Sequence, residues 1–398
     1  MVVQFFGAFN DNLLKTLVSL LIVIWVHNAQ TRDQLVYFSG VVFVAPFLIF
    51  SMVAGRLSDR VGKPRVILGV QIWQLVVVLV AMVSLLAQHI PWMMGALFLL
   101  SMQAAFFSPA KYGILPELMD DHELSNANGL FNMGTFTAIL LGTVAGSFLA
   151  LRLGWACGLL IAASVIALAS SLTMMPLPAA KPDETWAWNP ITDLIANWRL
   201  IRQNRSLKLG IIAVNYFWFV GAVLQLNIFI YAKDMLNAGP RFSGLLLIAA
   251  TIGIGLGSFL AGKFSQHHLE LGWVPIGALG MSLFAIDLCW AYHSRDRTLF
   301  DLFMMGMSGG FYEVPLNSFV QWHSPKGERG RILATVNFFS FMAILGASGV
   351  LYVMGTWLRL DPAQIFGALG FASLAAMGLI VFRTAESRHY FASHLPFR

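Results

Sequence analysis

The sequence predicts an all-α membrane protein with about twelve transmembrane helices in two six-helix halves. Three observations lead to this fold class. Of the 398 residues, 58% are hydrophobic and only 11% are charged, and one water-soluble core cannot bury that much apolar surface. Runs of about 20 apolar residues, the length that crosses roughly 30 Å of hydrocarbon, recur along the chain. A polar stretch at 176–206 divides these runs into two sets.

Turn residues and charges bound the apolar runs and so define the expected helices. In the N-terminal half the spans cover 2–26, 36–57, 65–87, 92–112, 125–150 and 154–175. In the C-terminal half they cover 207–231, 241–263, 271–291, 298–321, 330–355 and 361–383. The expected organisation is an N-terminal six-helix bundle at 1–175, a cytoplasmic linker with an amphipathic helix at 176–206, a C-terminal six-helix bundle at 207–383 and a cytoplasmic tail at 384–398.

Basic residues predict the orientation of these spans. The segments 56–65, 199–208 and 326–331 hold many of the lysines and arginines, whereas the loops on the opposite side hold few. An even number of spans puts both termini on one side, and the positive-inside rule makes that side cytoplasmic. Topology therefore accounts for the net charge of +6, and no nucleic-acid partner is expected. Met1 leads directly into a long, charge-bearing span, so we expect no cleaved signal peptide.

The linker is expected to contain a helix. Asn189 is a typical N-cap residue, Pro190 fits the first helical position and Asp193 lies in the first turn. At helical spacing the apolar side chains share one face and the arginines another, namely Ile191, Leu194, Ile195, Trp198 and Ile201 against Arg199, Arg202 and Arg205. This pattern is typical of a helix that lies on the bilayer surface. A lipid-sensing or calmodulin-like role is an alternative for such a basic helix.

Short motifs recur at a fixed offset in the two halves. Ala54-Gly55-Arg56-Leu57-Ser58-Asp59 follows the second span, and Ala261-Gly262-Lys263-Phe264-Ser265-Gln266 follows the eighth, 207 residues later. Pro109 and Pro315 recur near the same offset. Two parallel six-helix halves, related by an axis along the membrane normal, explain such a repeat and are typical of one class of transporters.

The first copy continues as Gly55-Arg56-Leu57-Ser58-Asp59-Arg60-Val61-Gly62-Lys63-Pro64-Arg65. It resembles the G-x-L-x-D-R-x-G-x-x-R loop between helices two and three of major facilitators, and the resemblance implies the major facilitator superfamily fold. The expected gating residues are Gly55, Arg56, Asp59, Arg60 and Arg65. The glycine lets helices approach, the carboxylate meets a helix N-terminus or a basic neighbour, and the arginines pair at the cytoplasmic face. The alternative is that the charges of this motif only set the topology of the chain and have no gating role.

The first span carries the strongest polar cluster. A charge in hydrocarbon costs about 2.5–3.5 kcal/mol even on the mildest scale, so each one needs a reason. Asp11, Asn12 and Lys15 lie about ten residues from the cytoplasmic end, near the membrane midplane. At helical spacing Asp11 and Lys15 share a polar stripe with Gln4, which must face protein or water. We expect these residues to bind substrate, and mutual neutralisation of the two charges as an i, i+4 pair is the alternative.

Further polar residues in other spans are candidate substrate-binding residues. Glu313 is the only charge in a polar, glycine-containing stripe of span ten that also holds Asn317. Gln225 lies in a stripe of amides and aromatics in span seven, which fits helix packing or a substrate cavity equally well. Lys111 lies near the inner end of span four, where an interface anchor is the alternative.

Two further segments sharpen the resemblance. Phe107-Ser108-Pro109-Ala110-Lys111-Tyr112-Gly113-Ile114-Leu115-Pro116-Glu117-Leu118 and Asn126-Ala127-Asn128-Gly129-Leu130 resemble the S-P-A-K-Y-G-I-L and A-N-G-L segments of the bacterial lysophospholipid transporter family. Gly7-Ala8-Phe9-Asn10-Asp11-Asn12 resembles its opening G-A-F-x-D-N, and Val314-Pro315-Leu316-Asn317 its V-P-L-N. Tyr231-Ala232-Lys233-Asp234 and the variant Phe9-Asn10-Asp11-Asn12 resemble members fused to acyltransferase and acyl-carrier-protein ligase domains more than the stand-alone transporters. Where stand-alone members carry an arginine in span seven, this sequence has Gln225, which leaves Lys15 as a candidate replacement.

The resemblance implies transport of lysophospholipids, chiefly lysophosphatidylethanolamine, from the outer to the inner leaflet of the bacterial inner membrane for re-acylation, by alternating access. It implies membrane lipids as surroundings and an acyltransferase/acyl-carrier-protein ligase, separate or fused, as partner. A zwitterionic head group needs a cation for its phosphate, for which Lys15 or Lys111 is available, and an anion for its ammonium, for which Asp11 or Glu313 is available. Phenylalanines and methionines can line an apolar path for the acyl chain.

Three other functions are alternatives to lysophospholipid transport. A proton-coupled small-molecule or drug exporter of the same fold is the main alternative, because fold alone does not determine substrate. An acyltransferase would need a histidine and an aspartate separated by four residues, and none of the nine histidines offers this, so we do not expect an enzyme. A non-transporting scaffold leaves the membrane charges unexplained. Cys157 and Cys289 have no metal-site spacing, no cofactor is expected, and Asp287 and Asp301, near helix ends, are assigned no binding role.

Overall fold

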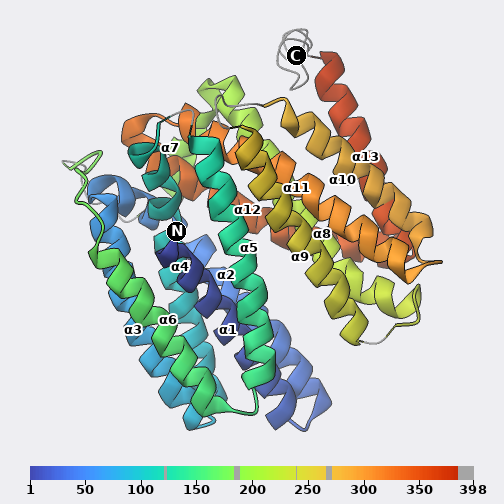
Figure 1. Ribbon diagram of the computed structural model, residues 1–398, viewed down its shortest axis with the longest axis horizontal. Helices are drawn as coiled ribbons and strands as arrows, with labels where there is room; N and C mark the ends of the chain where they lie inside the picture. The colour runs from blue at the N-terminus through green and yellow to red at the C-terminus, as the bar shows by residue number, and fades with distance from the viewer. Residues whose placement is uncertain (121–122, 183–188, 239, 266–270, 384–398) are drawn as a thin grey trace. The chain divides into compact units, whose positions relative to one another are not determined.

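The computed structural model describes residues 1–398 except 121–122, 183–188, 239, 266–270 and 384–398 (Figure 1). Twelve long helices of the described chain correspond to the twelve predicted spans. In the N-terminal half they are α1 (Val2–Trp25), α2 (Ala29–Arg60), α3 (Lys63–Leu86), α4 (Ile90–Leu118), α5 (Leu124–Leu149) and α6 (Leu153–Leu172). In the C-terminal half they are α8 (Arg205–Asp234), α9 (Pro240–Phe264), α10 (Trp273–Ala291), α11 (Arg295–His323), α12 (Arg329–Tyr352) and α13 (Pro362–Arg383). The all-helical membrane architecture is confirmed.

Length and composition make most of these helices membrane spans. Within the described residues, ten of them are long and apolar enough to cross a membrane. The other two are α11 and α13. Polar and glycine residues lower the mean hydropathy of α11, and the apolar stretch Pro362–Ala375 of α13 is shorter than a full membrane span. α4 is longer than predicted, because the helix continues through Pro109 and Pro116. Proline is tolerated inside membrane helices, since neighbouring groups satisfy the backbone carbonyls that it leaves unpaired.

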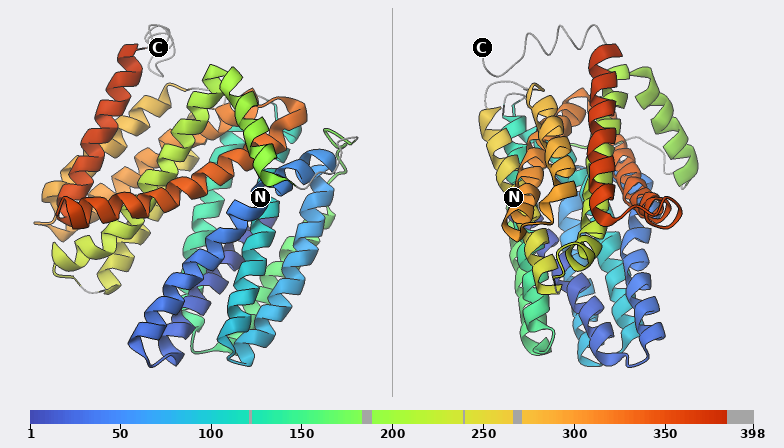
Figure 2. Two further views of the ribbon diagram at one scale, coloured as in Figure 1. Left: turned by 180° about the vertical axis from the view of Figure 1, so that it is seen from behind. Right: turned by 90° about the vertical axis from the view of Figure 1, so that its right-hand side faces the viewer.

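The connections contain three short helical elements. The linker helix α7 (Pro190–Gln203) begins where the sequence predicts, and the Asn189 side chain accepts a hydrogen bond from the Thr192 N–H at 3.2 Å. A 3-10 turn at Lys326–Glu328 precedes α12, and a π-helical turn at Val353–Trp357 follows it. Figure 2 shows the chain turning back after this π-helical turn into α13.

The chain forms two compact units that do not coincide with continuous halves of the sequence. The first unit comprises Met1–Leu118, Thr137–Arg205 and Ser324–Phe341. The second comprises Met119–Phe136, Ser206–His323 and Met342–Arg398. α5 and α12 therefore each contribute to both units, and α7 belongs to the first. The exact bounds of two six-helix bundles remain a prediction.

In the first unit, α1 lies among other helices. It packs against α2, α4 and α6, and α3 packs against α4 and α6. Buried side chains such as Leu13, Leu17, Val78 and Leu97 form the apolar core of these helices. α5 also approaches α1 closely, because a Cβ atom at Gly142 would lie 2.5 Å from the Phe9 carbonyl oxygen. The charged residues of α1 are thus carried by a helix with neighbours on several sides.

The glycines of the two motif copies permit equivalent helix contacts. A Cβ atom at Gly55, near the end of α2, would lie 2.5 Å from the Ala334 Cβ at the start of α12 in the first unit. A Cβ atom at Gly262, near the end of α9, would lie 3.0 Å from the Gly129 Cα at the start of α5 in the second unit. The sequence repeat therefore corresponds to a repeated close approach of helices. Gln266 lies outside the described residues.

In the second unit, α11 packs against α9 and α10. Glycines on both α9 and α11 make the closest contacts. A Cβ atom at Gly253, Gly257, Gly306 or Gly310 would lie 2.0–2.2 Å from a backbone atom of the facing helix. Since no real Cβ atom fits at such a distance, these glycines allow the two backbones to approach.

A valine at Gly257 is expected to destabilise the second unit by about 1–3 kcal/mol, the usual cost of overpacking. The added Cβ would lie 2.0 Å from the Met307 carbonyl oxygen, which belongs to the helix backbone and cannot rotate away. Gly255→Val is the matched control, because a Cβ atom there meets nothing within 4 Å. The thermal unfolding midpoint in detergent should fall for Gly257→Val only. Equal midpoints for the two variants would contradict this packing.

Candidate functional site

Asp11, Lys15 and Lys111 bring charged groups into the first unit. The first two lie on α1 and the third on α4, and these helices pack together. The Lys111 ammonium interacts electrostatically with the Asp11 carboxyl group. Asp11 Oδ1 is buried and has no hydrogen-bond partner among the described residues. The site therefore combines a carboxylate oxygen of Asp11 that can accept a further hydrogen bond with the positive charge of Lys111.

Aromatic rings lie beside both lysines. Lys15 Nζ lies 4.5 Å from the Phe43 ring centroid, and Lys111 Nζ lies 4.6 Å from that of Tyr112. Cation–π contacts of this kind attract an ammonium group to the face of a ring. In the described part of the chain, Asp11 and Lys15 form no ion pair with each other. The two charges of α1 are thus not joined as an i, i+4 pair.

The asparagines next to Asp11 bond to protein groups. Asn10 Nδ2 donates to the Leu160 carbonyl oxygen at 3.2 Å and to Ser164 Oγ at 2.8 Å, which connects α1 to α6. Asn12 Nδ2 donates to the Ala8 carbonyl oxygen of its own helix at 2.8 Å. Of the predicted cluster, Asp11 and Lys15 therefore have more capacity to bind a ligand than Asn12.

Glu313 lies in a separate polar network in the second unit. Its side chain is 2% exposed, and its two carboxylate oxygens accept hydrogen bonds from Asn132 of α5 and Asn317 of α11. The sequence indicated Glu313 and Asn317 but not Asn132. Amide donors on two helices thus surround a buried carboxylate.

The start of α5 continues this network. Asn128 and Gln321 exchange hydrogen bonds through their amides at 3.0 and 2.9 Å, and Asn128 also donates to Ser318 Oγ at 3.1 Å. These contacts connect α5 to α11. Asn128 and Asn132 are spaced i, i+4 along α5, a helical pattern that the sequence contained.

Gln225, the candidate residue of α8, has an exposed side chain.

Asp59 binds the N-terminus of α12. It is fully buried, and its carboxylate accepts hydrogen bonds from the backbone N–H groups of Gly330 at 2.8 Å and Arg331 at 2.9 Å. A carboxylate stabilises the unpaired N–H groups and the positive dipole end of a helix. The structure thus connects the last turn of α2 to a helix start 271 residues later.

The basic residues of the gating motif have different environments. Arg56 forms an ion pair with Asp193 of α7, and both side chains are largely buried. Lys63 is almost fully buried and pairs with Glu117 of α4. Arg60 is half-buried, whereas Arg65 is exposed. The pairing of Arg56 with the linker helix was not predicted, because the sequence assigned Asp193 only to helix initiation.

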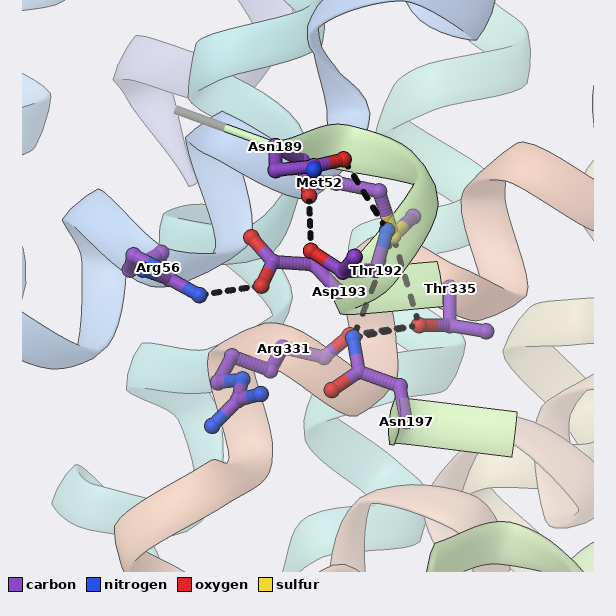
Figure 3. Close-up of polar contacts among 8 residues, drawn as sticks. All are labelled: Met52, Arg56, Asn189, Thr192, Asp193, Asn197, Arg331 and Thr335. Carbon is purple, nitrogen blue, oxygen red and sulfur yellow. Dashed lines mark hydrogen bonds and ion pairs between the residues drawn. The ribbon is translucent and has the colours of Figure 1, made fainter. Parts of the chain in front are cut away.

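The inward face of α7 is polar. Asn197 Nδ2 donates to Thr335 Oγ1 at 3.0 Å and to the Arg331 carbonyl oxygen at 3.4 Å, both on α12. Figure 3 shows Asp193 directed at Arg56 and Asn197 beside Thr335. Sequence reasoning missed Asn197 as a contact residue, although its i, i+4 spacing from Asp193 gives the required stripe.

The start of the linker makes contacts with the same region. The Lys181 N–H donates to the Asp59 carbonyl oxygen at 2.8 Å, and Lys181 Nζ pairs with Glu328 Oε1 at 2.7 Å. In the first unit both Lys181 and α7 therefore contact the end of α2 and the region around the start of α12. The Lys181 pair is partly exposed, so its own contribution to stability is small.

Asp287 lies apart from these clusters. It forms an ion pair with Arg297 near one end of α10, and both side chains are substantially exposed. The absence of a binding role for Asp287 remains a prediction, and its place outside both clusters makes it a suitable control position.

The sequence profile of the Major Facilitator Superfamily matches residues 1–348. The lysophospholipid transporter LplT of Photorhabdus laumondii is 28% identical over 95% of this chain and 92% of its own length. LplT of Enterobacter sp. is 29% identical over 94% and 92%, and that of Escherichia coli is 28% identical over 98% and 95%.

Solved structures show a similar fold. A human organic anion transporter superposes with a TM-score of 0.76 at 13% identity, covering 95% of this chain and 97% of its own. The E. coli fucose:proton symporter superposes with a TM-score of 0.75 at 11% identity, covering 96% and 97%. At these identities the likeness concerns the fold.

Proposed function

Because the chain belongs to the Major Facilitator Superfamily, we propose that it is a lysophospholipid transporter that works by alternating access. The observation that carries this proposal is its similarity, over 94–98% of its length, to transporters named for lysophospholipids. The relatives and the fold are those of transporters, and we propose transport rather than catalysis.

The charges of the first unit suit a zwitterionic head group. The proposed substrate is lysophosphatidylethanolamine, whose phosphate is bound by Lys111 and Lys15. Its ammonium group is bound by Asp11, whose buried Oδ1 has no hydrogen-bond partner in the part of the chain that the structure describes. Charge-assisted hydrogen bonds of both signs would then recognise the two ends of one head group.

The second unit supplies the further candidate groups. Glu313 and Asn317 form one hydrogen-bonded pair on α11, and we propose that they contact the head group at another stage of transport. Asn12 and Gln225 are assigned a secondary role, since Asn12 bonds to its own helix and Gln225 is exposed.

The gating motif is proposed to close and open one side of the transporter. Asp59 on the N-terminus of α12 and Arg56 on Asp193 are contacts that an opening movement would break. Gly55 allows the close approach of α2 and α12 that brings Asp59 to this N-terminus. Arg60 and Arg65 are proposed to interact with neighbouring groups or lipid head groups.

The proposed location is the bacterial inner membrane, with both termini in the cytoplasm. Transport would run from the outer to the inner leaflet, where an acyltransferase/acyl-carrier-protein ligase, separate or fused, re-acylates the lysophospholipid. A drug exporter of the same fold is the alternative that the experiment must distinguish.

Binding to the purified chain tests the substrate class. Lysophosphatidylethanolamine should raise the thermal unfolding midpoint, because a ligand at a hundred times its Kd stabilises the folded state by about 2.7 kcal/mol. Diacyl phosphatidylethanolamine and cationic drugs should have little effect. Stabilisation by drugs without stabilisation by lysophospholipid would favour the exporter.

Asp11→Asn tests the head-group assignment. The amide cannot attract an ammonium group, so this variant should bind lysophosphatidylethanolamine more weakly. Lysophosphatidylglycerol, which has no ammonium group, should bind as it does to the unsubstituted chain. Asp287→Asn is the matched control, since it removes a carboxylate outside the proposed site. Equal losses for both lipids would remove Asp11 from ammonium recognition.

A further inference from the structure

α7 has two faces of opposite character. Asp193, Asn197 and Ile201 are buried, and the first two contact Arg56 and Thr335 within the first unit. They recur at i, i+4 and i+8, which defines one stripe of the helix. The helix is therefore attached to the protein through a mainly polar stripe.

The opposite face is apolar and basic. Ile191 is 70% exposed and Ile195 is 47% exposed. Arg199 and Arg202 are also exposed, and helical spacing places Arg202 close to the line of the two isoleucines. The only acidic residue of α7, Asp193, is on the buried stripe. A helix surrounded by water gains nothing from isoleucines on its outer face.

The position of α7 in the chain places it at a membrane boundary. α7 ends at Gln203, and α8, a helix long and apolar enough to span a membrane, begins at Arg205. The C-terminal end of α7 must therefore lie near the polar head groups where α8 enters the bilayer. Exposed isoleucines beside arginines at that depth match the composition of helices that lie in the lipid interface.

We infer that the outer face of α7 is a docking surface for anionic phospholipid head groups. Arg199 and Arg202 bind the lipid phosphates, and Ile191 and Ile195 insert between the head groups. Through Asp193 and Asn197 on its other face, the same helix holds Arg56 and Thr335. The lipid surface is thereby linked to the end of α2. This inference does not depend on which substrate is transported.

Quenching by spin-labelled lipid tests the inference on the full chain. A fluorophore is attached at Ile195→Cys in a Cys157→Ala, Cys289→Ala background, and the protein is placed in nanodiscs of phosphatidylcholine with or without phosphatidylglycerol. Ala196→Cys is the control position, because Ala196 is also exposed but lies about 100° further round the helix. We expect stronger quenching at 195 than at 196, and an increase at 195 when phosphatidylglycerol is present.

Variants of the two arginines provide a second test of the inference. In phosphatidylglycerol discs, Arg199→Gln and Arg202→Gln should each reduce quenching at 195. The ratio of α7 in contact with lipid to α7 out of contact should fall about fivefold in each variant, as expected for one basic residue at an anionic surface. Equal quenching at 195 and 196 would overturn the inference. So would quenching at 195 that changes neither with lipid charge nor with the arginine variants, because anionic head groups would then not be the ligand. No lysophospholipid is present, so either outcome leaves the transport proposal untouched.

Discussion

Lys111→Gln is expected to abolish most lysophospholipid binding and transport. The substitution removes the cation whose charge acts on Asp11 and which is proposed to bind the substrate phosphate. A hydrogen bond to a charged group contributes about 1.5–3 kcal/mol, which corresponds to a loss of roughly ten- to a hundredfold in affinity. Titration of lysophosphatidylethanolamine against the purified variant, followed by transport in proteoliposomes, measures both effects.

Two further variants make this result specific. Lys111→Arg keeps the charge above the Tyr112 ring and should retain part of the binding, although the planar guanidinium presents its donors differently. Lys233→Gln removes a lysine from an exposed position at the end of α8 and should bind as the unsubstituted chain does. Equal losses in Lys111→Gln and Lys233→Gln would mean that net charge, and not this site, determines binding.

Asp59→Ala is expected to release the start of α12. The backbone N–H groups of Gly330 and Arg331 lose their acceptor, and each unsatisfied buried donor costs about 1–3 kcal/mol. Hydrogen exchange of these two amides should become roughly ten- to a hundredfold faster. Mass spectrometry of peptides that cover residues 326–334 in the full chain measures this exchange.

The matched control for this variant is another helix-capping aspartate. Asp361 Oδ1 accepts a hydrogen bond from the Gln364 N–H at 2.8 Å at the start of α13. Asp361→Ala should increase exchange there and leave residues 326–334 unchanged. If Asp59→Ala leaves the exchange of Gly330 and Arg331 unchanged, the carboxylate is not what holds the start of α12.

Much of the fold could be predicted from local sequence signals. Long apolar runs determine spans because the bilayer has a fixed thickness, and the start of α7 followed from the capping preference of Asn189 and the fixed φ of Pro190. The end of α4 could not be predicted, because prolines usually end helices in water but are tolerated where neighbouring helices surround them. Lys111 consequently lies inside a helix and not at its end.

Contacts between distant segments were harder to predict. The sequence indicated that Asp59 would meet a helix N-terminus or a basic neighbour, and the structure shows the former at α12. It did not show that Arg56 pairs with Asp193, because an amphipathic pattern distinguishes faces of a helix but not its partners. For the same reason Asn128 was recognised as part of a motif, while the contacts of Asn128 and Asn132 with α11 required the structure.

Movement of lysophosphatidylethanolamine between leaflets tests the central claim most directly. The full chain is reconstituted in proteoliposomes, and the lipid remaining in the outer leaflet is measured with a reagent that does not cross the membrane. Lysophosphatidylethanolamine should leave that leaflet faster than in protein-free vesicles and faster than diacyl phosphatidylethanolamine. If the folded, reconstituted chain moves lysophosphatidylethanolamine no faster than protein-free vesicles do, the chain is not a lysophosphatidylethanolamine transporter.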